Sequence, residues 1–321
     1  MTFNDNANLD TSQVSGGGGG GGFGRGAVIG GGGGIGGLVL LLLVYFLGGG
    51  DMLGGGGGGG SQSQGGNWNF GGGSVQAQQD TGSFGKGTGD FSHCKTGKDA
   101  NDHTDCRVIG TVNSVQDYWS KALPQDVNEQ YRKATTVIYN GRTQSQCGTA
   151  SNEVGPFYCP VDEKIYIDPA FFSELDKFGL ENPENKNLAQ MYIVAHEYGH
   201  HVQNILGLLG EAQKDAKGAE SGAVKVELMA DCLAGVWVKN ADSTQDAEGN
   251  TLIQKVTQEQ INQALEAAAA VGDDNIQQRS GRGVNPEGFT HGTSEQRQRW
   301  FMAGYDGGTA NSCNTFKAEN L

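Results

Sequence analysis

The chain has 321 residues and a formal net charge of −14, with 36 acidic against 22 basic side chains. Most of its 56 glycines lie in the first 90 residues, whereas the remainder has an ordinary composition and is long enough to bury a sizeable core. The negative charge argues against nucleic acid as the main partner, because binding phosphate requires a basic surface. The simpler explanation of the negative charge is that the acidic side chains only keep the domain soluble.

Glycine tracts dominate two parts of the first 90 residues. Glycines have no side chains to bury and cannot offset the entropy lost on ordering, so such tracts behave as flexible chain. We therefore expect a disordered Gly-rich tail over residues 1–26 and a flexible linker over residues 51–90. A single folded domain is expected over residues 91–321.

An uncharged apolar segment, AVIGGGGGIGGLVLLLLVYFLGGG, lies between the tracts at residues 27–50. With its flanking glycines it reaches the roughly 20 residues that a helix needs to cross a bilayer. A cleaved signal peptide is the alternative, but no small-residue cleavage site follows closely, so we expect a retained transmembrane anchor. Arg25 before the segment and Asp51 after it predict a cytoplasmic N-terminus by the positive-inside bias. The domain would then lie outside the cytoplasm, attached to the cell membrane by a single pass.

All six cysteines follow the apolar segment. An even number of cysteines on the outer side of a membrane suits disulfide bonds. The pairs that we expect are local, Cys94 with Cys106 and Cys147 with Cys159. Histidines near the first pair could suggest a second metal site, since histidine and cysteine both bind zinc. In an exported domain we prefer the disulfide.

The pattern of the folded part predicts an α+β domain that is mainly helical, with a small β-sheet. Short β-branched and aromatic runs beside turn residues are typical of strands, and longer apolar periodic runs are typical of helices. Strands are expected at residues 134–141 and twice within residues 157–168. Helices are expected at residues 113–133, 170–178, 187–209, 224–238 and 257–271, and after Thr293, which forms a capping box with Gln296.

The helix at residues 187–209 contains the sequence HEYGH, which fits the H-E-x-x-H pattern. Four residues apart on one helix, His196 and His200 project from the same face and can bind one zinc ion. Glu197 points in an adjacent direction, where it can act as general base on a zinc-bound water. Buried histidines held by hydrogen bonds are the alternative, which is weak for two histidines at this spacing around a glutamate.

A catalytic zinc needs a third protein ligand. The metzincin pattern would require glycine and histidine where the chain has Gln203 and Leu206, so that pattern is excluded. The following helix offers Glu227 and, on the same face, Asp231, an acidic pair that is costly to bury without partners. We expect Glu227 as the third ligand and Asp231 as the acceptor of a ligand histidine N–H. A solvated acidic stripe is the alternative, and it fits poorly with the apolar neighbours.

Three stretches together, HEYGHHVQ, VELMADCLAGVW and FTHGTSEQR, resemble the bacterial family of neutral zinc metallopeptidases. The upstream stretch QCGTASNEVGPFYCPVDEKIYIDPAFFSEL is similar to that family too, so the resemblance covers about residues 93–316. It implies a zincin-like fold of the gluzincin type, with His196, His200 and Glu227 as zinc ligands and Glu197 as catalytic base.

His291 is a further candidate for catalysis. It lies just before the capping box and could donate to the oxyanion that forms when water attacks a carbonyl. A capping or structural role at the helix start is an equal alternative. Arg297 could serve the same site or pair with an acid, whereas His201 points away from the metal. The edge of the strand at residues 164–168 could pair with an extended peptide.

These features predict a membrane-anchored zinc metallopeptidase, an endopeptidase that hydrolyses peptide bonds in peptide or protein substrates. Zinc on His196, His200 and Glu227 would lower the pKa of its bound water towards about 7, and Glu197 would take the proton. The rival hypothesis is a zinc-stabilised binding or scaffold domain at the cell envelope, without hydrolysis. Glu197 favours the enzyme, because a scaffold has no need of a base at that position.

Overall fold

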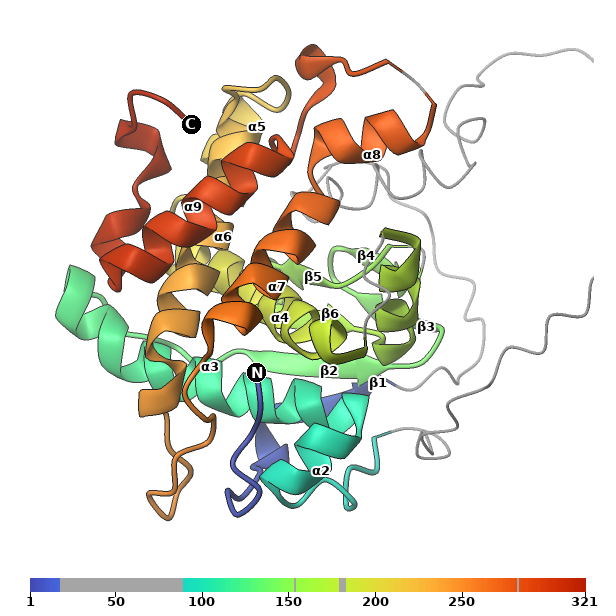
Figure 1. The fold of residues 1–321 in the computed structure, drawn as a ribbon, viewed down its shortest axis with the longest axis vertical. Helices are drawn as coiled ribbons and strands as arrows, with labels where there is room; N and C mark the ends of the chain where they lie inside the picture. Colours follow the sequence, from blue (N-terminus) through green and yellow to red (C-terminus); the bar gives the residue numbers. More distant parts are fainter. Residues whose placement is uncertain (18–88, 153, 179–182, 282) are drawn as a thin grey trace, which may run out of the picture.

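The computed structural model of the chain describes residues 1–17, 89–152, 154–178, 183–281 and 283–321. They form an α+β fold in which helices outweigh a small sheet, as the sequence predicts (Figure 1). The longer helices are α3 (Thr104–Val127), α4 (Pro183–Ile205), α6 (Gly222–Asn240), α7 (Gln258–Ala270) and α9 (Ser294–Gly307). The shorter ones are α2 (Gly97–Asp102), α5 (Glu211–Lys214) and α8 (Asp273–Arg279).

A mixed sheet lies beside the helices (Figure 1). Its strands follow the order β1 (Val14–Gly17), β2 (Thr135–Tyr139), β6 (Lys164–Ile167) and β5 (Phe157–Cys159). The first three run parallel, and β5 is antiparallel to β6. A separate hairpin joins β3 (Arg142–Ser145) to β4 (Gly148–Ser151).

The strand β6 is an inner strand, so the expectation that an extended peptide pairs with residues 164–168 is wrong. Its two sides are occupied by β2 and β5. Ile165 and Ile167 are fully buried, as expected of a strand in the middle of a covered sheet. The edge strands of this sheet are β1 and β5.

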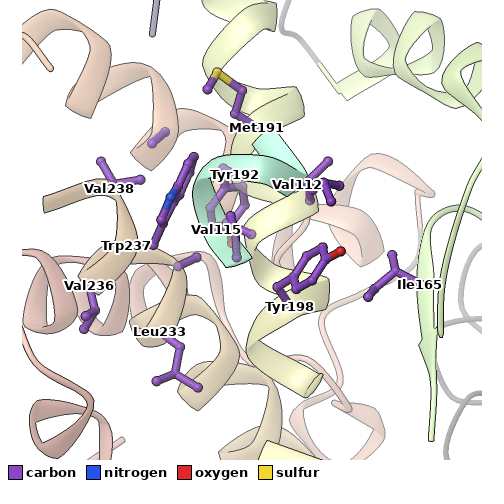
Figure 2. Close-up of a cluster of buried hydrophobic side chains, with 14 of the residues drawn as sticks. Val112, Val115, Ile165, Met191, Tyr192, Tyr198, Leu233, Val236, Trp237 and Val238 are labelled. Atoms are coloured by element: carbon purple, nitrogen blue, oxygen red, sulfur yellow. The ribbon is translucent and has the colours of Figure 1, made fainter. Parts of the chain in front are cut away.

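Helix α6 lies at the centre of the core. Ser221 caps its first turn by accepting from the N–H of Val224, and almost all of its residues are buried. Figure 2 shows Trp237 of α6 close to Tyr192 of α4, with valines of α3 beside them. The same core reaches the sheet, where the hydroxyls of Tyr198 and Thr136 lie 2.9 Å apart.

Residues 1–17 belong to this fold, so the expectation of a disordered tail over residues 1–26 is wrong for them. Phe3 is 1% exposed, and its ring lies against Gly110 of α3, where a Cβ would come within 2.5 Å of it. The tail was predicted from its glycines, but the first fifteen residues contain none. Their few apolar side chains are buried only because the tertiary structure provides a surface, including α3, against which they pack.

The predicted membrane anchor at residues 27–50 lies outside the described residues, as does all but the end of the linker predicted at residues 51–90. Within the described ranges, no helix is both long and apolar enough to cross a bilayer. The anchor and the linker therefore stay predictions of the sequence.

Two predicted helices differ in detail from the observed ones. Residues 170–178 form a 3₁₀ helix, η2 (Pro169–Phe178), whose start is held by the carboxylate of Asp168 accepting from the N–H of Ala170. Helix α3 begins nine residues earlier than predicted because its first turns are buried too. Its Pro124 lies near the C-terminal end, and Asn128 ends the helix in the left-handed conformation at φ 59°.

Three disulfide bonds connect the six cysteines. Cys94–Cys106 and Cys147–Cys159 are the two pairs that the sequence predicts, and both are confirmed. The third, Cys232–Cys313, joins α6 to the C-terminal segment. The described part of the chain has no free cysteine.

Replacing Phe3 with alanine should destabilise the domain by about 3–5 kcal/mol, because it removes a fully buried ring and leaves a cavity against α3. Chemical denaturation of the full chain measures this difference. Val161→Ala is the control, since Val161 is 60% exposed and should change stability by no more than about 0.5 kcal/mol. Equal effects of the two substitutions would contradict the packing of residues 1–17 on the domain.

Candidate metal centre

The site forms where α4 crosses α6 at close range. A Cβ at Gly199 of α4 would lie 3.0 Å from both the Cα and the carbonyl oxygen of Ala230 in α6. A larger side chain at this position would hold the two backbones apart. The glycine of HEYGH therefore allows the two helices to pack closely. This close approach brings the histidines of α4 to the acidic side chains of α6.

His196, His200 and Glu227 lie together, as the sequence predicts. The Nε2 atom of His196 lies 3.2 Å from one oxygen of Glu227, and the Nε2 atom of His200 lies 3.5 Å from the other. The three ligand atoms are all within 4.8 Å of one another. Two imidazole nitrogens and one carboxylate oxygen are a donor set that zinc prefers.

Asp231 of α6 contacts the ring of His196. Its Oδ1 atom lies 2.8 Å from Nδ1 of His196, which leaves Nε2 directed at Glu227. Arg297 of α9 donates to both oxygens of Asp231, at 2.8 Å each, and Tyr192 donates its hydroxyl proton to Oδ1. Burial would raise the pKa of Asp231, but Arg297 and His196 outweigh it and hold the pKa below its ordinary value. Arg297 thus pairs with an acid and acts on the site through Asp231.

Gln203 holds the second histidine, a role that the sequence analysis missed. Its Oε1 atom lies 2.8 Å from Nδ1 of His200, and its amide nitrogen donates to the carbonyl of Val226 at 2.6 Å. The side chain is fully buried. Its spacing three residues after His200, inside an apolar helix, was a usable signal, because a buried amide needs partners. Burial lowers the pKa of His200 to about 4, which keeps the ring neutral as a metal ligand requires.

Glu197 is a buried carboxylate with one unpartnered oxygen. The backbone N–H of Tyr158 in β5 donates to its carboxylate, but Oε2 has no hydrogen-bond partner among the described residues. Burial raises the pKa of Glu197 to about 7, and the nearby charge of Glu227 adds to the shift. A buried oxygen without a partner is uncommon and marks a place for a water or a ligand.

His291 lies beside this cluster and is held by Asp273 of α8. Its Nδ1 atom is 3.4 Å from one oxygen of Asp273, whose other oxygen accepts from the backbone N–H groups of Thr290, His291 and Gly292. Burial alone would lower the pKa of His291, but the carboxylates of Glu227 and Asp273 outweigh it and raise the pKa. Asp273 was missed because its partner lies 18 residues away in sequence.

The capping role considered for His291 is carried by other residues. Thr293 and Gln296 form the predicted capping box at the start of α9, with each side chain bonded to the backbone of the other. The ring of His291 takes no part in that box. Its side chain is therefore available to the cluster at Glu227.

Two other histidines lie apart from the cluster. His201 bonds Tyr158 and the carbonyl of Arg132, so it points away from the cluster, as predicted. His93 lies 2.9 Å from Asp105, beside the Cys94–Cys106 disulfide. These four groups are close enough to hold a metal ion, but both cysteine sulfurs are engaged in the disulfide.

Replacing Gln203 with alanine should lower zinc affinity about 10- to 100-fold, because His200 loses the partner that fixes its ring while every ligand atom remains. Competition with a chromogenic chelator measures the affinity of the full chain. Gln213→Ala makes the same change at an exposed position of α5 and should leave the affinity unchanged. An unaltered affinity in Gln203→Ala would show that the ring orientation of His200 does not depend on this contact.

The chain is similar to several known proteins. The chain is 47% identical to an uncharacterized protein of Mycobacterium bovis, over 72% of this chain and 77% of that one. It is 39% identical to an uncharacterized protein of Escherichia coli K12, over 63% of this chain and 68% of that one. No solved structure matches it. Residues 3–316 match the family described as "Putative neutral zinc metallopeptidase", and the chain belongs to that family.

Proposed function

We propose that the chain is a zinc-dependent endopeptidase whose ligands are His196, His200 and Glu227. One observation supports hydrolysis above all others. Glu197 is buried beside the ligand cluster with an unpartnered oxygen, Oε2. A site built only to hold a metal has no use for such a group, since burying it is costly.

The residues fit a zinc ion. Both histidines direct Nε2 at the cluster because their Nδ1 atoms are bonded to Asp231 and Gln203. The three residues are only 6 to 8% exposed, so an ion held by them keeps limited contact with solvent. Zinc held there would supply a Lewis acid that activates a water molecule and polarises the scissile carbonyl.

Glu197 is the proposed general base. Its pKa, raised to about 7 by burial, suits a carboxylate that takes a proton near neutral pH and gives it back. The proton of the attacking water would go to Oε2 and then to the nitrogen of the leaving amine. The N–H of Tyr158 holds the carboxylate in orientation during both transfers.

His291 is the proposed donor to the negative charge that develops on the carbonyl oxygen. Asp273 positions the imidazole, with one carboxylate oxygen 3.4 Å from Nδ1. A positively charged or N–H donor aimed at developing charge is a large contribution to catalysis in a site that excludes water.

Attachment to a membrane through residues 27–50 is part of the same proposal. The segment is uncharged and long enough to enter a bilayer. Three disulfides in the folded part suit a domain outside the cytoplasm.

Glu197→Gln should abolish cleavage while the chain still binds one zinc, because the substitution removes the base and no ligand. The measurement is bound zinc per chain together with cleavage of a mixed peptide library, followed by mass spectrometry, for the full chain. Glu248→Gln, at an exposed position, is the matched control and should cleave normally. Zinc binding without cleavage in the wild type would favour the scaffold alternative over the peptidase.

His291→Gln should reduce kcat about 100- to 1,000-fold with an unchanged zinc content, because the side chain stabilises charge in the transition state and is not a ligand. Steady-state kinetics on a peptide identified from the library would separate kcat from KM. A loss of zinc in this variant would instead assign His291 to metal binding.

A further inference from the structure

Residues 1–17, which we call the docked segment, are held on the domain by contacts that recognise its backbone. The side-chain amide of Asn101 bonds both the N–H and the carbonyl of Phe3, at 2.9 and 3.0 Å. The amide of Asn113 does the same for Asp10, at 2.8 and 2.9 Å. Two such double contacts require the segment to lie in one register on α2 and α3.

Three separate parts of the chain pair with the docked segment. The N–H of Asn4 donates to Leu252, the N–H of Leu9 donates to Lys95, and β1 pairs with β2 from Val14 to Gly17. The segment thereby covers the outer edge of β2, which would otherwise expose unpaired backbone groups. It is an integral part of the sheet and the core.

The described residues on either side of positions 18–88 lie close together. The docked segment ends at Gly17, and the next described residue is Gly89. A Cβ built at Gly89 would lie only 2.9 Å from the Cα of Gly16. Gly17 and Gly89 therefore lie near each other at the surface of the described domain.

We propose that the docked segment and residues 89–321 lie on the same side of the membrane, as one folded unit. A single crossing of the bilayer between Gly17 and Gly89 would place them on opposite sides. It would also leave Phe3 and the edge of β2 without the partners that bury them. The proposal rests on the proposed membrane attachment through residues 27–50, and it replaces the expected single pass with an attachment that has no net crossing of the bilayer. It therefore replaces the expectation of a cytoplasmic N-terminus joined to an exported domain, and it does not depend on catalytic activity.

The test is cysteine labelling of the full chain in its membrane. All six native cysteines are in disulfides, so an introduced thiol is the only free one. Ser15→Cys lies at an exposed position of β1, and Val161→Cys lies at an exposed position of the domain. A membrane-impermeant maleimide is applied to intact cells and to inverted vesicles. The labelling of each is compared with the labelling of the same chain unfolded in urea and detergent, where every free thiol reacts. We expect both cysteines to react from the same side.

A neighbouring position tests the docking itself. Val14 is buried in β1, next to the exposed Ser15, so Val14→Cys should be protected at least tenfold in rate until the chain is unfolded. Labelling of Ser15→Cys from the side opposite to Val161→Cys, in whole or in part, would overturn the proposal. Equal labelling rates of Val14→Cys and Ser15→Cys in the native chain would also overturn it, because an undocked segment exposes both.

Discussion

The buried carboxylate of Asp231 is the contact on which the rest of the site depends. It lies on α6, accepts from His196 and Tyr192 of α4, and is paired with Arg297 of α9. Removing any one partner would leave a charge or a polar group buried without compensation, which is strongly destabilising. The three central helices are therefore fixed relative to one another by the same group that orients His196.

This arrangement joins the stability of the fold to the geometry of the proposed metal centre. The close crossing at Gly199 sets how near α4 comes to α6, and the Cys232–Cys313 disulfide ties the residue after Asp231 to the C-terminal segment. Asp231 and Gln203 each leave one imidazole nitrogen directed at Glu227. A site prepared in this way loses little conformational freedom when it binds an ion or reacts, which is the physical advantage of preorganisation.

The sheet and the C-terminal helices contribute the groups that hold Glu197 and His291 beside the cluster. The strand β5 supplies a backbone N–H to Glu197, and α8 supplies the carboxylate that holds His291. Glu197 lies on α4 with the two histidines, whereas His291 precedes α9, so the proposed base and the proposed charge donor belong to different elements.

Local sequence patterns determined the helical character of the domain, the two local disulfides and the presence of four chemically matched side chains. His196, His200, Glu227 and Asp231 could be grouped from sequence because helical spacing places each pair on one face, and because buried acids need partners. Tyr192 and Asp273 could not be assigned in the same way. Their partners lie on another helix or far along the chain, and only packing decides which polar groups meet.

The docked segment and the inner position of β6 were decided by tertiary structure alone. Seventeen residues with a few apolar side chains have no stable structure by themselves, since they cannot bury enough surface to offset their entropy. They gain that surface only when α2, α3 and β2 are already in place. Likewise, an apolar strand does not reveal from its own residues whether it has one neighbour or two.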